Sequence, residues 1–201
     1  MHTDRATPDY VALDAQAVRT SIELAARART ADLSRQTPCV GWTLYGLLAH
    51  MTTQHVGFAA ASRGEGDLAW WKLRSLEDDP VGTYRASAEH VLAAFAADGV
   101  LDRLFPLPEF GGGHAFPAEQ AISFHFIDYV VHSWDLAKTL GVEVEFEPEL
   151  LEAALGVAKA VPGGKVRLAP GAAFAPEVVW TGGSRLDEIV AILGRSPSWP
   201  D

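Results

Sequence analysis

The stretch AISFHFIDYVVHSWDLAKTL, residues 121–140, decides how this chain folds. It predicts one long helix, because Pro117 stands just before it and Gly141 just past it. Aromatic and aliphatic side chains cover most of its circumference, so we expect burial on most sides. At about 100° per residue, its polar positions fall close to one stripe: His125, Asp128, His132 and Asp135.

Two residues of this stripe have the spacing of metal ligands. Asp128 and His132 are four residues apart, which lets one carboxylate and one imidazole of a helix converge on a single point. A solvent-facing stripe would carry Lys, Glu, Gln or Arg, and this one carries only His and Asp. The stripe is therefore expected to face partner side chains or an ion.

Composition bounds the class of protein. The chain has 201 residues, 48% hydrophobic and 21% charged, as in ordinary globular proteins. Its net charge of -10 favours solubility and, with no basic cluster, argues against nucleic acid as a partner. No apolar run approaches the ~20 residues that span a bilayer, so no membrane partner is expected. The single cysteine and the lack of a signal-peptide pattern predict a cytoplasmic protein.

The rest of the chain predicts further helices and almost no strand. Helical periodicity covers residues 9–35, 44–63 and 80–97, whereas residues 99–117 look like a loop. With residues 121–140 these segments predict an all-α fold, an antiparallel four-helix bundle over residues 1–145. Residues 146–201 are expected to form a small C-terminal extension, partly helical, packed on the bundle. Apolar bundle faces make a homodimer plausible.

Bundles build metal sites from inward side chains on facing helices, which supplies a third ligand. The hypothesis is that His50, from the second helix, joins Asp128 and His132. Two imidazoles and one carboxylate suit zinc, and equally nickel or iron(II). Three protein ligands would leave a position open for water or substrate. The alternative is that the three residues are unrelated polar side chains in the core.

Other polar residues have candidate roles near this site. His125 and Asp135 are the candidate catalytic, proton-transfer residues, with a plain salt bridge as the alternative for Asp135. His55 points about 140° away from His50 and is expected to be exposed or to contact a loop. The remaining expectations are that Gln54 orients His50, that Trp42 fills a gap in the core, and that Cys39 is a packed structural thiol.

Two segments resemble a known family. TPCVGWT followed by LLAHM, within residues 37–51, and HFIDYVVHSWDLAKTLG, residues 125–141, resemble the DinB-like metal-binding superfamily. The resemblance is to its actinobacterial group related to the N-terminal domain of mycothiol-dependent maleylpyruvate isomerase. It implies a four-helix bundle holding zinc through His50, Asp128 and His132. In the isomerase the middle ligand is a glutamate, and Asp128 is a shorter carboxylate.

The resemblance also suggests what the site does. It implies a metal-dependent enzyme that uses a low-molecular-weight thiol such as mycothiol on a small electrophilic substrate, as a transferase or isomerase. One alternative is a non-catalytic metal- or ligand-binding protein of stress or detoxification. Another is a metal-dependent hydrolase with a metal-bound water as nucleophile.

Overall fold

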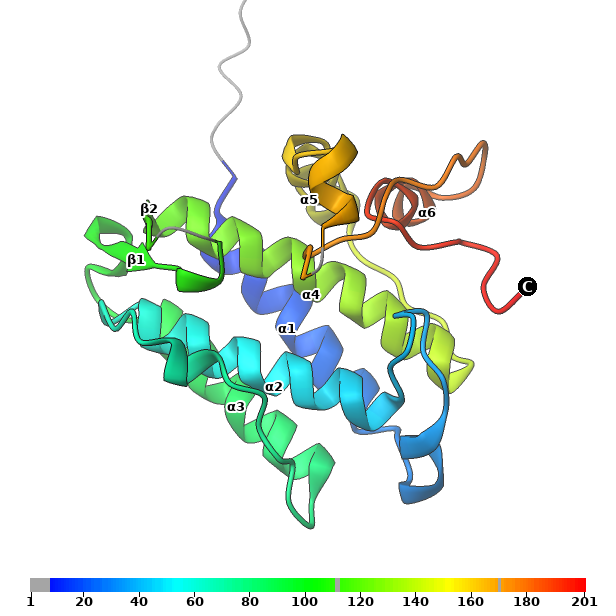
Figure 1. Cartoon of the computed structure of the whole chain (residues 1–201), viewed down its shortest axis with the longest axis horizontal. Helices are drawn as coiled ribbons and strands as arrows, with labels where there is room; N and C mark the ends of the chain where they lie inside the picture. The colour runs from blue at the N-terminus through cyan, green and yellow to red at the C-terminus, as the bar shows by residue number, and fades with distance from the viewer. Residues whose placement is uncertain (1–7, 111–112, 170) are drawn as a thin grey trace, which may run out of the picture.

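A computed structural model describes residues 8–110, 113–169 and 171–201 of the chain. Helices dominate the described residues, and the predicted all-α four-helix bundle is confirmed (Figure 1). The bundle consists of α1 (Tyr10–Ala25), α2 (Leu44–Ala61), α3 (Pro80–Phe95) and α4 (Ala118–Leu140). Two helices follow, α5 (Pro148–Ala160) and α6 (Arg185–Ile192).

The ends of these helices follow local chemistry. Thr43 caps α2 by accepting a hydrogen bond from the amide of Gly46, and Asp79 caps α3 in the same way. α4 ends at Leu140 because Gly141 adopts the left-handed conformation, with a φ of 69°. The long helix predicted from residues 121–140 is therefore confirmed, with three further residues at its start.

The first helix is shorter than predicted. The prediction of one helix over residues 9–35 is wrong beyond Ala25, and a separate 3-10 turn, η1 (Thr30–Ser34), follows. The side chain of Asp32 accepts hydrogen bonds from the backbone amide and the guanidinium of Arg29, which is extended. This local bonding competes with helical hydrogen bonds and turns the chain.

Residues 99–117 hold more order than a loop. Strands β1 (Leu104–Pro106) and β2 (Ala115–Pro117) pair antiparallel, with Phe105 opposite Phe116. Three short 3-10 turns complete the connections around this hairpin: η2 (Leu68–Trp71), η3 (Val100–Asp102) and η4 (Pro108–Phe110). Strands of three residues are too short to show alternation, which is why the sequence did not predict them.

The helices run in two parallel pairs that oppose each other. His55 of α2 contacts Tyr84 and Ser87 of α3, and further along both helices Phe58 lies near Phe95, so α2 and α3 run in the same direction. In contrast, α2 and α4 run antiparallel, because His50 faces His132 while His55 faces His125. The connection over residues 62–79 returns the chain to the end at which α2 begins.

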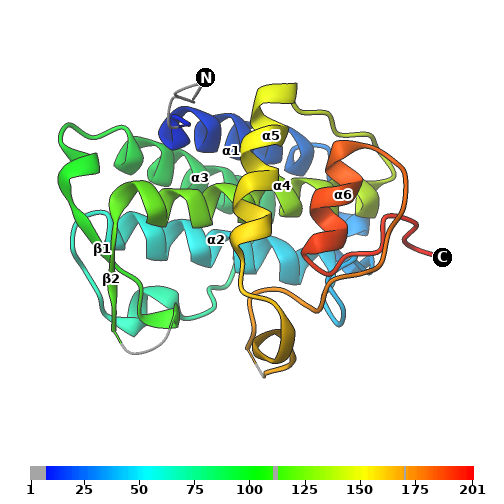
Figure 2. The same ribbon diagram turned by 90° about the horizontal axis from the view of Figure 1, so that it is seen from above.

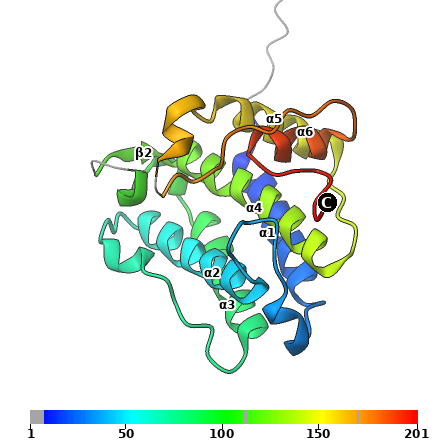
Figure 3. The same cartoon turned by 45° about the vertical axis from the view of Figure 1, so that its right-hand side comes forward.

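The C-terminal helices cover α4. Figure 2 shows α5 crossing α4, and Figure 3 shows α5 and α6 on the side of α4 away from α2 and α3. Leu150, Ala154 and Ile189 belong to the same buried cluster as Val131 and Trp134 of α4. A further 3-10 turn, η5 (Gly164–Leu168), lies between the two helices. None of the described helices combines the length and apolar character needed to cross a bilayer.

Candidate metal centre

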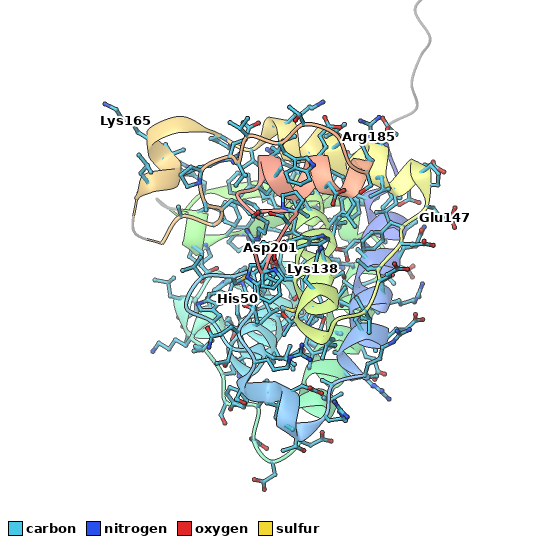
Figure 4. The ribbon with its side chains drawn as sticks, turned by 90° about the vertical axis from the view of Figure 1, so that its right-hand side faces the viewer. His50, Lys138, Glu147, Lys165, Arg185 and Asp201 are labelled. Atoms are coloured by element: carbon cyan, nitrogen blue, oxygen red, sulfur yellow. The ribbon has the colours of Figure 1, made fainter. Side chains whose placement is uncertain are left out.

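The three predicted ligands lie together at one end of the bundle. His50 lies on α2 and Asp128 and His132 on α4, and their donor atoms all fall within 4.8 Å of one another. The Nε2 of His132 is 3.3 Å from the Oδ1 of Asp128, and the rings of His50 and His132 are 5.3 Å apart. Figure 4 views the molecule from this end, with His50 labelled.

The site is reachable from one side. The His132 side chain is 3% exposed and that of Asp128 is 21% exposed, while His50 is partly exposed. Trp42 packs its indole 4.7 Å from the ring of His50. The prediction that Trp42 fills a core gap is wrong, since 36% of it is exposed. It forms a wall of the site instead.

Asp135 fixes the orientation of His132. Its Oδ2 lies 2.9 Å from Nδ1 of His132, so the other ring nitrogen is directed at Asp128. Asp135 is completely buried and also accepts hydrogen bonds from Arg195 at 3.2 Å and from the Cys39 thiol at 3.1 Å. A histidine whose second nitrogen is anchored by a carboxylate is the usual arrangement around protein-bound metals.

A second set of donors also lies close together, formed by Cys39, His132 and Asp135. A guanidinium nitrogen of Arg195 lies 3.3 Å from the Cys39 sulfur and 3.2 Å from the Asp135 carboxylate. This fixed cation would repel a metal ion at that position. In the first set no Lys or Arg nitrogen of the described residues lies within salt-bridge distance of a donor atom, so this set is the better candidate.

The charges of the site shift its protonation. Burial lowers the pKa of His132, but the Asp128 carboxylate and the hydrogen bond that His132 donates to Asp135 outweigh it and raise the pKa to about 10. Burial and the neighbouring His132 lower the pKa of His50 to about 4. Burial raises the pKa of Asp135, but Arg195 and His132 outweigh it and lower the pKa to about 2. Asp135 is therefore a stable anion at neutral pH.

The structure places His125 away from this centre. Along the helix axis it lies about 4.5 Å from Asp128 and about 10 Å from His132, at 1.5 Å per residue, and it is completely buried. Its Nδ1 is 2.7 Å from a carboxylate oxygen of Asp14 on α1, and its ring stacks 4.2 Å from Tyr129. The proton-transfer role predicted for His125 has no support in this geometry.

His55 and Gln54 also differ from expectation. The prediction that His55 is exposed is wrong: it is completely buried and its Nδ1 bonds to Ser87 at 2.9 Å. α2 is enclosed by α3, α4 and η2, so a direction away from His50 is not a direction to solvent. Gln54 donates its amide to Glu109 at 3.0 Å, and no hydrogen bond joins it to His50 among the described residues.

Sequence reasoning missed two charged residues near the centre. Arg195 follows α6, 60 residues after the aspartate that it neutralises. Glu109 belongs to η4 in the hairpin connection. No periodic pattern marks either residue, and only the packing of distant segments places them.

The four-helix bundle and this donor set define a class of bundle proteins that could hold a divalent metal between facing helices. Residues 15–137 match the family described as mycothiol maleylpyruvate isomerase N-terminal domain, and the chain belongs to that family. This confirms the predicted resemblance.

The chain is also similar to sequence relatives and to solved structures. An uncharacterized protein from two strains of Mycobacterium tuberculosis is 32% identical to this chain over 176 residues. The aligned region covers 86% of this chain and 90% of the relative. Among solved structures, the chain is similar to the mycothiol-dependent maleylpyruvate isomerase, with a TM-score of 0.65 and 14% identity, over 98% of this chain and 94% of that one. A mutant of that enzyme gives a TM-score of 0.59 over 88% of this chain and 77% of that one, again at 14% identity. These structures support the fold, including the C-terminal helices.

Proposed function

We propose that this protein binds one divalent metal, zinc in the first instance, through His50, Asp128 and His132. At that metal it would use a low-molecular-weight thiol such as mycothiol on a small electrophilic substrate, as a transferase or an isomerase. The observation that carries the proposal is the convergence of two imidazoles and one carboxylate to within 4.8 Å of one another. Three protein ligands with a solvent-facing side are the arrangement of catalytic rather than structural zinc.

The thiol in this proposal comes from relatives. The matching family carries mycothiol maleylpyruvate isomerase in its description, and the similar solved structures are of a mycothiol-dependent enzyme. When bound, the metal would supply a positive charge that favours the thiolate, the reactive form of a thiol.

The residues of the chain would have separate tasks. Asp135 acts as a positioning residue, because it holds the His132 ring with Nε2 toward Asp128. Arg195 forms an ion pair with Asp135 and so compensates the buried negative charge of that carboxylate. Trp42 shields one side of His50 from water.

The first test is metal content. Untagged protein would be analysed for bound elements beside the variants His132→Ala and Asp128→Asn, with His90→Ala as control because His90 is an exposed histidine of α3. We expect about one metal ion per chain in wild type and control, and almost none in the two ligand variants. Metal retained in both variants would remove the ligand assignment.

The second test is thiol use. Cobalt(II) would replace the native metal, and mycothiol would be titrated while the visible spectrum is followed. A changed cobalt spectrum supports the thiol role. An unchanged spectrum together with ester or amide hydrolysis favours the hydrolase, and an unchanged spectrum without any turnover favours a non-catalytic metal-binding protein. The last alternative has one observation in its favour, because neither predicted proton-transfer residue is free at the site.

A further inference from the structure

A cavity lies between the end of α5, the turn η5 and the segments around α6. Its volume is about 650 Å³, which falls within the range of about 300–1,000 Å³ that is usual for small-molecule sites. The three candidate metal ligands are not among its described lining residues. Figure 4 shows Lys165 of η5 well away from the labelled His50. The cavity is therefore separate from the candidate metal centre.

Much of the cavity wall is apolar. The apolar side chains that line it come from α5, η5, α6 and the segment between them: Ala158, Val161, Leu168, Pro176 and Ile192. Leu168 is 71% exposed, and its neighbour Val166 is 57% exposed. Ligand sites are mostly lined by apolar side chains, with a few polar groups that orient the ligand. This wall can therefore take the apolar body of a small molecule.

The charged residues of the same cavity are mainly cationic. Lys159, Lys165 and Arg167 line it, against the single carboxylate of Glu177. Lys159 is already paired, because its Nζ lies 3.2 Å from an oxygen of Glu188. Among the described residues, no carboxylate lies within salt-bridge distance of Lys165 or Arg167. In a chain of net charge -10, this local excess of positive charge favours an anionic ligand.

Arg167 shows that the site is built rather than incidental. Only 8% of this residue is exposed. Its guanidinium donates hydrogen bonds to the backbone carbonyls of Pro162, Val161, Ala175 and Ile192, which fixes it in the cavity wall. These carbonyls satisfy N–H groups but carry no full negative charge. Arginine is almost never buried without a charged partner, and an anion in the cavity would supply one.

We propose that this cavity binds a small organic anion, a carboxylate with an apolar body. The carboxylate lies against Arg167 and Lys165, and the apolar body lies along the wall that includes Leu168. A carboxylate suits this position because hydrogen bonds between a guanidinium and an ionised oxygen are about twice as strong as neutral ones. The proposal does not depend on the metal centre or on the use of a thiol.

The test uses octanoate as the probe and octanamide as its uncharged match. Both would be titrated into the full-length protein, by calorimetry and by amide chemical shifts. We expect saturable octanoate binding, with the shift changes concentrated in α5, η5 and α6, and octanamide binding at least about fivefold weaker. Equal affinity for the two probes would overturn the proposal, and so would the absence of saturable octanoate binding or shift changes confined to other elements.

Two variants assign the charge. Lys165→Glu reverses an exposed charge at the cavity and should weaken octanoate binding about fivefold or more, while Lys72→Glu, an exposed lysine that follows η2, should behave as wild type. Arg167→Gln should abolish binding in a variant whose circular dichroism shows a folded protein. If Arg167→Gln fails to fold, Lys165→Glu decides the outcome. Unchanged octanoate affinity in Lys165→Glu would overturn the proposal.

Discussion

Replacing Asp135 with asparagine would test how the interior of the bundle controls the candidate metal centre. Asp135 is completely buried and its carboxylate lies 2.9 Å from Nδ1 of His132. Asparagine keeps the shape but removes the charge that raises the basicity of the ring. Loss of such a partner typically weakens metal affinity by about 10–100-fold, which corresponds to about 1.4–2.7 kcal/mol of binding free energy.

The same substitution also costs folding stability. Arg195 is only 8% exposed and would lose its counter-charge. Breaking a buried ion pair by removing one partner costs about 3–5 kcal/mol. Asp135→Asn should therefore lower both the free energy of unfolding and the metal affinity.

Two assays separate these effects, and a matched control exists within the bundle. Metal affinity would be measured by competition with a chromophoric chelator, and stability by urea unfolding of the metal-free protein. Asp14→Asn removes another buried aspartate, one that pairs with His125 at 2.7 Å away from the centre. It should lower stability and leave metal affinity unchanged. A folded Asp135→Asn variant that binds metal as tightly as wild type would refute the reasoning, and so would an equal loss of affinity in Asp14→Asn.

Three further predictions concern protons and packing. Metal must displace the proton held by His132, whose pKa is raised to about 10, so metal affinity should rise about tenfold per pH unit between pH 6 and 8; a pH-independent dissociation constant would contradict this. Burial keeps the pKa of His55 well below its usual value. At acidic pH the unfolded chain therefore binds a proton on His55 that the folded chain does not. The free energy of unfolding should fall as the pH drops below about 6.5, by up to about 1.4 kcal/mol per pH unit. Urea unfolding at pH 7 and 5 should show a smaller drop in His55→Leu than in wild type. Gly57→Ala would place a methyl group 2.5 Å from the Trp71 ring and should lower the free energy of unfolding by about 1–3 kcal/mol. Gly156→Ala meets nothing within 4 Å and should stabilise its helix by about 0.5–1 kcal/mol. Thermal unfolding should therefore show a lower melting temperature for the first variant and a higher one for the second.

The polar stripe of residues 121–140 shows how far periodicity reaches. It groups His125, Asp128, His132 and Asp135 on one side of α4, but the structure gives these side chains different partners. His125 bonds to α1, Asp128 and His132 face α2, and Asp135 bonds to the segment after α6. A helix surface in a bundle meets several neighbours, so a shared stripe does not make a shared site.

The error on His55 has the same origin. Its direction relative to His50 followed correctly from helix geometry, but whether that direction leads to water depends on what packs there. The side chain meets Tyr84 and Ser87 of α3 instead. Helix α3 begins at the same end as α2 because residues 62–79 return along the bundle, and no local signal encodes that return.

The sequence by itself determined the helices of the bundle and the local pair of Asp128 and His132, because helical periodicity, caps and i, i+4 spacing are properties of neighbouring residues. Tertiary structure alone decided which distant groups join that pair. Arg195 neutralises Asp135, Trp42 covers His50, and Glu109 accepts a hydrogen bond from Gln54 of α2. The physical reason is that burial and charge pairing depend on the packing of segments that are far apart along the chain.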